Sequence, residues 1–239
     1  MTPGGAAPGP VALVAQRKAP LRAHWTRRES FRALAGPLYA IADAEALAPT
    51  PPPEAVRAMA GAGVRWIQLR AKRASGAALF RLAEDCLAAL AGTGVAHWID
   101  DRADLAALFP FAGVHLGQTD LPAAAARKVV GEGPWIGLST HDGAQLAAAA
   151  DDPAVDVVAV GPVFPTRGKE RPDPDVGLPF LAAARARTTK PLVAIGGIDA
   201  GNVARVLAAG VDTAAVLTAV CRGDVAANCR RLLAAAAAG

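Results

Sequence analysis

The chain has 239 residues, of which 53% are hydrophobic, and 25 basic and 21 acidic residues give a formal net charge of +4 at pH 7. This length suits one α/β barrel and is sufficient to bury a sizeable core. The apolar runs are short and interrupted by charges or glycine, which argues against a membrane-spanning helix.

The positive charge is concentrated at the N-terminus. Residues 1–36 hold six basic residues and a single acidic one, Glu29, whereas the other 19 basic and 20 acidic residues nearly cancel. We therefore expect residues 1–36 to be a basic, Pro/Ala/Gly-rich and disordered extension rather than a targeting peptide, and residues 37–239 to form the folded domain. A nearly neutral domain does not indicate a nucleic-acid-binding surface.

Cys86, Cys221 and Cys229 are odd in number and show no CxxC spacing. Such cysteines are typical of reduced thiols in a cytoplasmic protein, and they do not indicate a disulfide framework.

Short β-rich runs alternate with Ala/Leu-rich stretches of helical spacing. Eight alternations without a change in composition predict parallel strands with crossover helices, and thus a single (β/α)₈ barrel, with a doubly wound open sheet as the alternative. The predicted strands span residues 38–42, 64–70, 95–99, 113–116, 135–139, 155–160, 191–195 and 213–218. In such barrels the functional groups lie at the carboxyl ends of the strands.

The second predicted strand ends in "QLRAK". Side chains alternate along a strand, so Gln68, Arg70 and Lys72 are expected on one face. Two cations and an amide at the barrel mouth suit an anion, although a strand end that becomes polar as it leaves the core is the other reading.

Acidic residues follow the third and fourth strands, in "WIDDRADLA" and "HLGQTDLP". Asp100, Asp101 and Asp120 would lie close together, because neighbouring strands are about 4.8 Å apart. A Mg²⁺ ion would relieve their repulsion and leave coordination positions for substrate phosphate oxygens. Asp101 and Asp120 also suit helix caps, and the two roles are compatible.

The fifth strand ends in "GLSTHD". Ser139, His141 and Asp142 are too close in sequence to predict a catalytic triad, and no G-x-S-x-G motif surrounds Ser139. We expect the Ser139 hydroxyl to bind a phosphate and Asp142 to cap a helix.

The last loops suggest a second phosphate site. Gly196 and Gly197 follow the seventh strand, where barrels often bind phosphate through backbone N–H groups, although the pair also suits a plain turn. The sixth strand leads into "GPVFPTRGKERPDPDVGL", whose first half is interpreted as part of the site and whose second half as a solvated continuation.

These motifs resemble those of the thiamine-phosphate synthase and TenI family. The likeness covers about residues 38–220 and rests on "QLRAK", "IDDRADLA", "GVHLGQTDLP", "IGLSTHD", "VGPVFPT" and "AIGGIDAGNV". The resemblance implies a Mg²⁺-assisted transferase that joins hydroxymethylpyrimidine diphosphate to hydroxyethylthiazole phosphate. Diphosphate would leave first, and the thiazole nitrogen would then capture the pyrimidine-methyl cation.

The resemblance also implies roles for individual residues. Asp101 and Asp120 match the metal ligands, and Arg70, Lys72, Ser139 and Lys169 match residues that act on the diphosphate. The expected substrate-binding residues are Gln68, Asp100, Thr166, Gly168, Gly196, Gly197, Leu217 and Thr218.

Two positions depart from the family pattern. Asp100 stands where the family usually has Asn, and Gly168 stands where it usually has Thr. The alternatives are therefore a TenI-like thiazole tautomerase with His141 as acid/base, or a barrel that binds thiazole or thiamine phosphates without turnover. An unrelated phosphate-binding barrel isomerase would explain strands seven and eight but not "QLRAK".

Overall fold

The computed structural model describes residues 28–166 and 174–238, and in them eight parallel strands close into a barrel. Each strand pairs with the next along the chain, and β8 pairs with β1. The predicted (β/α)₈ barrel is therefore confirmed, and the open-sheet alternative is excluded. The strands are β1 (Leu38–Asp43), β2 (Trp66–Arg70), β3 (Ala96–Asp100), β4 (Gly113–Leu116), β5 (Trp135–Thr140), β6 (Val157–Val160), β7 (Leu192–Ile195) and β8 (Thr213–Val216).

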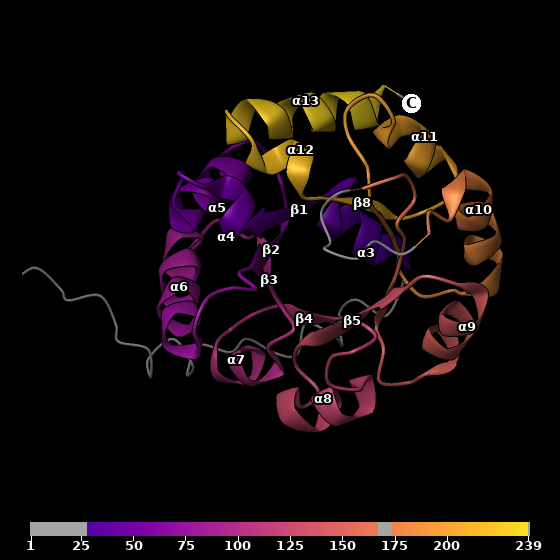
Figure 1. Cartoon of the computed structure of the whole chain (residues 1–239), viewed down its shortest axis with the longest axis horizontal. Coiled ribbons are helices and arrows are strands. Elements are labelled where there is room, and N and C mark those ends of the chain that lie inside the picture. The colour runs from indigo at the N-terminus through magenta and orange to yellow at the C-terminus, as the bar shows by residue number, and fades with distance from the viewer. Residues whose placement is uncertain (1–27, 167–173, 239) are drawn as a thin grey trace, which may run out of the picture.

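Most of the helices form a ring outside the strands (Figure 1). None of the helices in the described ranges is long and apolar enough to cross a membrane. The helices are α3 (Arg28–Ala35), α4 (Ala44–Leu47), α5 (Pro52–Gly61), α6 (Gly76–Ala89), α7 (Ala103–Leu108), α8 (Ala123–Val130), α9 (Gly143–Asp151), α10 (Gly177–Arg187), α11 (Val203–Ala208), α12 (Thr218–Cys221) and α13 (Val225–Ala237).

Aromatic side chains fill the barrel interior. Tyr39 stacks on Trp66 with ring centroids 4.3 Å apart, and Trp66 lies 4.8 Å from Trp98. Room for the Trp98 ring comes from Gly113, where a Cβ atom would lie only 2.7 Å from that ring. The interior cluster comprises Phe31, Ala35, Tyr39, Ile41, Trp66, Trp98, Ala112, Trp135, Val157, Ala159, Val193 and Ala215.

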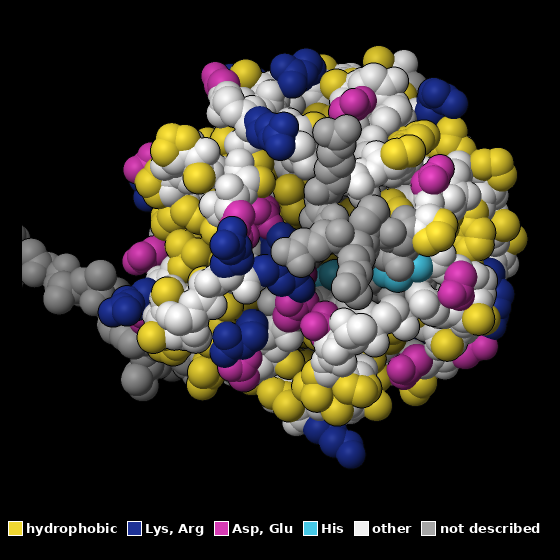
Figure 2. All heavy atoms as spheres, viewed as in Figure 1, with side chains coloured by type: hydrophobic (Ala, Val, Ile, Leu, Met, Phe, Trp, Pro, Cys, Tyr) yellow, Lys and Arg dark blue, Asp and Glu magenta, His cyan; other side chains and the backbone are white. Residues whose placement is uncertain are grey.

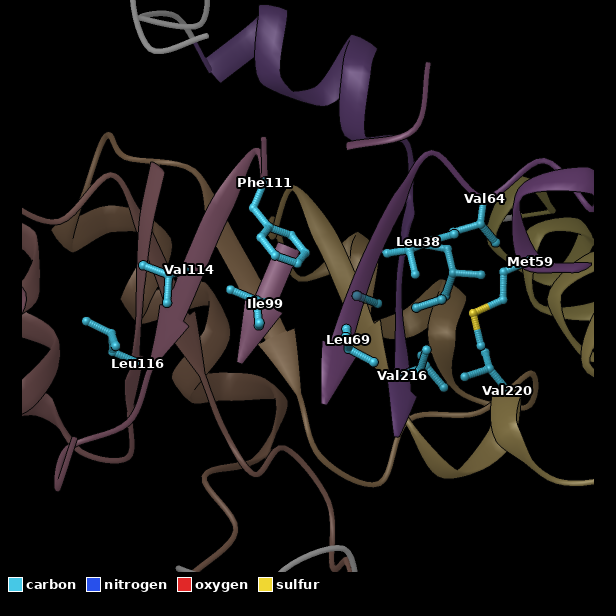
Figure 3. Close-up of a cluster of buried hydrophobic side chains, with 14 of the residues drawn as sticks. Leu38, Met59, Val64, Leu69, Ile99, Phe111, Val114, Leu116, Val216 and Val220 are labelled. Carbon is cyan, nitrogen blue, oxygen red and sulfur yellow. The ribbon is translucent and has the colours of Figure 1, made fainter. Parts of the chain in front are cut away.

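A second core lies between the strands and the helices. It is built from the strand residues of the opposite alternation, such as Leu69, Ile99 and Val114, and from apolar helix residues such as Met59 (Figure 3). The strands are thus buried on both faces, as expected for parallel sheets, and this explains their continuous β-branched and aliphatic runs.

The helix α3 closes the amino-terminal end of the barrel. Its Phe31 is fully buried, with its ring centroid 4.8 Å from Trp66 and 5.6 Å from Trp135, and α3 crosses the centre of the barrel in Figure 1. The predicted boundary after residue 36 therefore lies too far along the chain, because the open end of the barrel needs an apolar cover. Residues 1–27 of the predicted extension lie outside the described residues.

The strand ends differ slightly from the prediction. The predicted eighth strand reached Thr218, but β8 ends at Val216 and Thr218 begins α12. The sixth strand begins at Val157 rather than Val155. Among the described residues, these differences leave the candidates at or just after the carboxyl ends of their strands, apart from Gln68, which lies within β2.

Candidate active site

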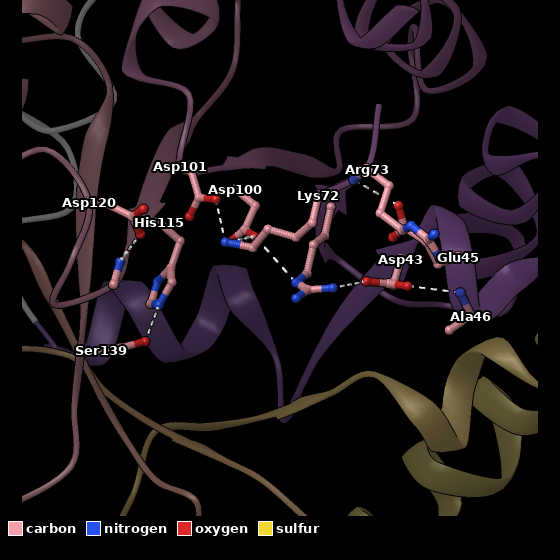
Figure 4. Close-up of polar contacts among 12 residues, drawn as sticks. Asp43, Glu45, Ala46, Lys72, Arg73, Asp100, Asp101, His115, Asp120 and Ser139 are labelled. Carbon is pink, nitrogen blue, oxygen red and sulfur yellow. Dashed lines mark hydrogen bonds and ion pairs between the residues drawn. The ribbon is translucent and has the colours of Figure 1, made fainter. Parts of the chain in front are cut away.

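A row of alternating charges crosses the carboxyl ends of β1 to β4 (Figure 4). Arg70, the last residue of β2, contacts the Asp43 carboxylate, and its Nε lies 3.3 Å from Oδ2 of Asp100. Lys72 lies 3.4 Å from the same Asp100 oxygen and also contacts Asp101. The structure thus brings Arg70 and Lys72 together with the carboxylates at the end of β3.

On the face of the barrel drawn in Figure 2, basic and acidic side chains lie side by side near the centre, with histidine next to them. Leu69 and Ala71 pack in the outer core, on the face of β2 opposite Gln68 and Arg70, but the residues of "QLRAK" lie at different depths. Gln68 is buried deeper on β2, whereas Arg70 is the last residue of β2 and Lys72 follows the strand with a half-exposed side chain. Only the two cations therefore lie in the charged row.

Burial and crowding shift the pKa values in this row. Burial, followed by the Asp101 charge, raises the pKa of Asp100 to about 6 despite the neighbouring cations. Burial would lower the pKa of Lys72, but the Asp100 and Asp101 carboxylates outweigh that effect and raise it. Among these residues carboxylates outnumber cations, so the site favours an additional positive charge.

Asp101 is held in an unusual conformation. Its φ of 60° is the only positive value of a non-glycine residue in the described ranges, and its N–H donates to the His115 carbonyl at 2.8 Å. Burial raises the pKa of Asp101, Lys72 opposes this effect, and the nearby Asp120 carboxylate raises the pKa further. This left-handed conformation, which Asp adopts more readily than most residues, occurs where the two carboxylates meet.

The cap alternative for these two aspartates is wrong. The N-cap position of α7 is Arg102 and that of α8 is Pro122, and neither helix has a side-chain cap. The Asp120 carboxylate instead accepts from the Gly117 N–H at 2.7 Å. Asp142, by contrast, caps α9 as predicted, accepting from the Gln145 N–H at 2.8 Å.

The Asp101 and Asp120 pair fits a Mg²⁺ ion by its chemistry. Two adjoining carboxylates are hard oxygen donors that repel each other without a cation, and Mg²⁺ typically takes one or two carboxylates together with substrate phosphates. No group of three or more His, Cys, Asp or Glu side chains suited to a metal occurs in residues 28–166 and 174–238. The two carboxylates by themselves would therefore supply only part of a coordination shell.

His115 is a site residue that sequence reasoning missed. Its Nε2 lies 2.8 Å from the Ser139 hydroxyl oxygen. A residue of β4 thus orients the Ser139 side chain on β5. A Cβ atom at Gly137 would lie 2.6 Å from His115 Nδ1, and this glycine is what lets the ring lie there. The signal was present in the sequence, because His115 alternates with Gly113 and thus points inward.

The His141 side chain contacts the start of the loop after β6. Its ring Nδ1 lies 2.5 Å from the Gly161 carbonyl oxygen, and its backbone N–H donates to Oε1 of Gln145 at 2.8 Å. The histidine next to the Ser139 hydroxyl is therefore His115, in agreement with the absence of a triad motif.

The loops after β6 and β7 pack closely together. The Phe164 N–H donates to the Gly196 carbonyl at 3.1 Å, and a Cβ atom at Gly196 would lie 2.5 Å from Pro162. Gly197 has φ of 66°, and its Cβ would lie 2.7 Å from that of Phe164. The glycine pair is therefore required by the contact between the two loops, a reason that the sequence interpretation did not include.

The remaining candidates surround this contact. Leu217 packs against the interior cluster, Thr218 begins α12, and Thr166 follows β6 at the last described position before the gap. Gly168 and Lys169 lie outside the described residues.

The fold and the charged row define a (β/α)₈ barrel of the kind that binds phosphorylated small molecules at the carboxyl ends of its strands. The family model for thiamine monophosphate synthase matches residues 38–220, which include all eight strands. The chain therefore belongs to the thiamine monophosphate synthase family.

Individual relatives agree with this assignment. A thiamine-phosphate synthase of Koribacter versatilis is 43% identical over 184 residues, covering 75% of this chain and 86% of that protein. The one from Methanoculleus marisnigri is 43% identical over 177 residues, covering 74% and 83%. Among solved structures, a thiamine phosphate pyrophosphorylase from Pyrococcus furiosus is similar with a TM-score of 0.77 and 29% identity, covering 87% of this chain and 98% of that one.

Proposed function

We propose that this protein is a thiamine-phosphate synthase, a transferase that joins hydroxymethylpyrimidine diphosphate and hydroxyethylthiazole phosphate and releases diphosphate. The observation that carries the proposal is the meeting of Arg70 and Lys72 with the Asp101 and Asp120 carboxylates at one barrel mouth. Membership of the family supports the choice of substrates.

The proposed reaction breaks and forms one bond. The bond between the pyrimidine methylene carbon and the diphosphate oxygen breaks, and the oxygen keeps the electron pair. The lone pair of the thiazole nitrogen then forms the new C–N bond. The protein must therefore stabilise negative charge on the leaving diphosphate, which preorganised cations do well in a site with little water.

Arg70 and Lys72 are the described cations placed for that task. Arg70 is held between two carboxylates and Lys72 is half exposed, with a charge that its neighbours stabilise. We assign the Ser139 hydroxyl to the diphosphate as a hydrogen-bond donor, oriented by His115. Lys169 would add a third cation, and Gln68 and Asp100 would contact the pyrimidine half of the substrate.

Asp101 and Asp120 would hold Mg²⁺ together with the diphosphate. A bound Mg²⁺ would supply charge neutralisation on the leaving group. The excess of carboxylates over cations in the described part of the row supports this assignment, because a diphosphate alone would be repelled.

The thiazole phosphate would bind on the opposite side of the barrel mouth. Backbone N–H groups at Gly197 and at Leu217 and Thr218 lie in the loops that barrels use for phosphate, and Thr166 adds a hydroxyl. Gly168 would contribute its N–H in place of the usual threonine side chain.

We place the enzyme in the cytoplasm, where its substrates would be small phosphorylated molecules rather than nucleic acids or lipids. All three cysteines are free and buried, which suits a reducing compartment.

A TenI-like tautomerase remains the second candidate, and what favours it is Asp100, which stands where the family usually has Asn. Asp100 adds a negative charge where a diphosphate would bind. The retained set of Lys72, Asp101 and Asp120 favours the synthase, since a tautomerase with His141 as its acid/base makes no use of it.

The experiment is an assay of the purified protein with both substrates and Mg²⁺, following thiamine phosphate and diphosphate together. Equal amounts of both products are expected, and neither should form when one substrate or Mg²⁺ is withheld. Absence of thiamine phosphate, with calorimetry showing that only the thiazole phosphate binds, would refute the synthase. Conversion of a thiazole phosphate carboxylate to its isomer would then establish the tautomerase.

A further inference from the structure

Asp43, at the carboxyl end of β1, is buried beside Arg70. The two residues are partners in the register of β1 and β2, and the Asp43 side chain is only 4% exposed. A buried carboxylate is costly unless both of its oxygens have partners. Asp43 belongs to none of the motifs that define the site.

Both carboxylate oxygens of Asp43 accept hydrogen bonds. Oδ1 accepts from the Ala46 N–H at 2.8 Å and so caps α4, while Oδ2 accepts from Nη1 of Arg70 (Figure 4). The short α4 is also tied to the loop after β2, because Oε1 of Glu45 accepts from the Arg73 N–H at 3.0 Å. Asp43 and Arg70 are thus joined through side chains at the strand ends, and their two loops are joined by a separate contact.

The contacts of Arg70 determine which edge of its guanidinium is left for a ligand. Nη1 is bound by Asp43, and Nε lies 3.3 Å from Asp100. The guanidinium is thus hydrogen-bonded at Nη1 and in ion-pair contact at Nε, which within the described residues leaves the Nη2 edge for a ligand. The Arg70 guanidinium is therefore already oriented before an anion binds to it.

We propose that Asp43 is a positioning residue that holds the Arg70 guanidinium so that its Nη2 edge faces the departing diphosphate. The inference rests on the proposed function for the identity of the anion. Asp43 acts only through Arg70 and does not touch the substrate. The Asp43 carboxylate places a negative charge near an anion site, which disfavours anion binding. It also fixes the Arg70 guanidinium, which then needs no reorientation when the anion binds.

The variant that tests this is Asp43→Asn. Asparagine is as good a helix cap as aspartate, so its carbonyl oxygen can keep the bond from Ala46. Its NH₂ group would then face the Arg70 donors, which removes the contact with Arg70 while leaving the cap. Asp224 offers the matched control, because it caps α13 through the Ala227 N–H at 2.9 Å and has no resolved role in the charged row.

The first readout is independent of turnover: calorimetric binding of inorganic diphosphate in the presence of Mg²⁺. We expect Asp43→Asn to weaken this binding about tenfold and Asp224→Asn to leave it unchanged. If Asp43 only lowered the local positive potential, its neutralisation would tighten binding, and that result would overturn the proposal.

The second readout is a double-mutant cycle on turnover. Asp43→Asn is expected to lower kcat about tenfold or more with a smaller change in the KM for the thiazole phosphate, whereas Asp224→Ala should change thermal stability but neither constant. In an Arg70→Gln background the Asp43→Asn change should have no further effect. Full additivity of the two losses would also refute the proposal.

The two proposals can fail separately. If the unmodified protein makes no thiamine phosphate but binds diphosphate in an Asp43-dependent way, the synthase is refuted and the positioning role is upheld. If it makes thiamine phosphate and Asp43→Asn matches it in binding and in kcat, the positioning role is refuted and the synthase is upheld.

Discussion

Nε2 of His115 lies 2.8 Å from the hydroxyl oxygen of Ser139, and the carbonyl of the same histidine accepts from the Asp101 N–H at 2.8 Å. One residue of β4 therefore holds both a proposed diphosphate ligand and the backbone of a proposed metal ligand. The two halves of the charged site are connected through it.

The first prediction concerns this connection. His115→Leu should lower kcat about tenfold or more, because the Ser139 hydroxyl loses its partner, while the carbonyl bond to Asp101 stays. Steady-state kinetics measure the effect, and Ser139→Ala is expected to mask it in the double variant. Gly137→Ala should have a similar effect, since its Cβ would displace the imidazole.

The second prediction concerns the metal. Asp101→Asn should reduce Mg²⁺-dependent turnover by on the order of a hundredfold, because it removes one of two carboxylate ligands. Asparagine is the suitable replacement, since it tolerates the positive φ of this position. The control is Asp104→Asn, which changes an exposed carboxylate paired with Arg102. Activity that survives both Asp101→Asn and chelation of Mg²⁺ would remove the metal assignment.

The third prediction concerns pH and stability. Burial lowers the pKa of His97 to about 3, and neither ring nitrogen has a hydrogen-bond partner among the described residues. Between pH 6.5 and about 3 the unfolded chain binds a proton at this residue that the native protein does not. The free energy of unfolding should therefore fall with decreasing pH by about 1.4 kcal/mol per unit from this residue alone.

His97→Leu should flatten that dependence without loss of stability at pH 7.5, because it also removes two unsatisfied polar atoms beside Phe111. Denaturant unfolding of both proteins at several pH values measures the difference. Parallel curves for the two proteins below pH 6.5 would show that His97 does not titrate in this way.

The fourth prediction concerns the packing of the loops after β6 and β7. Gly197→Ala should destabilise the protein by roughly 2–4 kcal/mol and impair thiazole phosphate binding, since its Cβ would collide with Phe164 and its φ is positive. Gly131→Ala is a matched control, because Gly131 has φ of 68° but no atom near its Cβ position. Thermal unfolding should show a loss of only about 1 kcal/mol there. Equal losses at the two positions would mean that backbone strain alone is responsible.

The sequence predicted the barrel because the strand and helix periods alternate eight times without interruption. It also placed the charged residues at the correct strand ends, since Arg70 and Asp100 terminate β2 and β3. Where a strand ends depends on residues that are neighbours in the sequence. The alternation of side chains and the residues typical of turns are therefore enough to predict it.

The partners of those residues were not predictable in the same way. Asp43 follows the first predicted strand and belongs to no site motif, and only the register of β1 with β2 reveals that its second oxygen meets Arg70. His115 lies within β4 and not in the loop that follows, so no loop motif points to it. The helix α3 was assigned to the extension because its basic composition outweighed Phe31 and Ala35, the apolar residues that anchor it in the barrel interior.

The aromatic stack under the site has a consequence for how the protein can be observed. Three of the four tryptophans, Trp66, Trp98 and Trp135, belong to the barrel interior, and Trp25 is the fourth. Trp98 is two residues before Asp100 on β3, so its indole lies one layer below the carboxylates. Neutralising or occupying the charged row changes the electric field at these rings. A Trp25→Phe protein would thus report ligand occupancy by its own fluorescence, with no label attached.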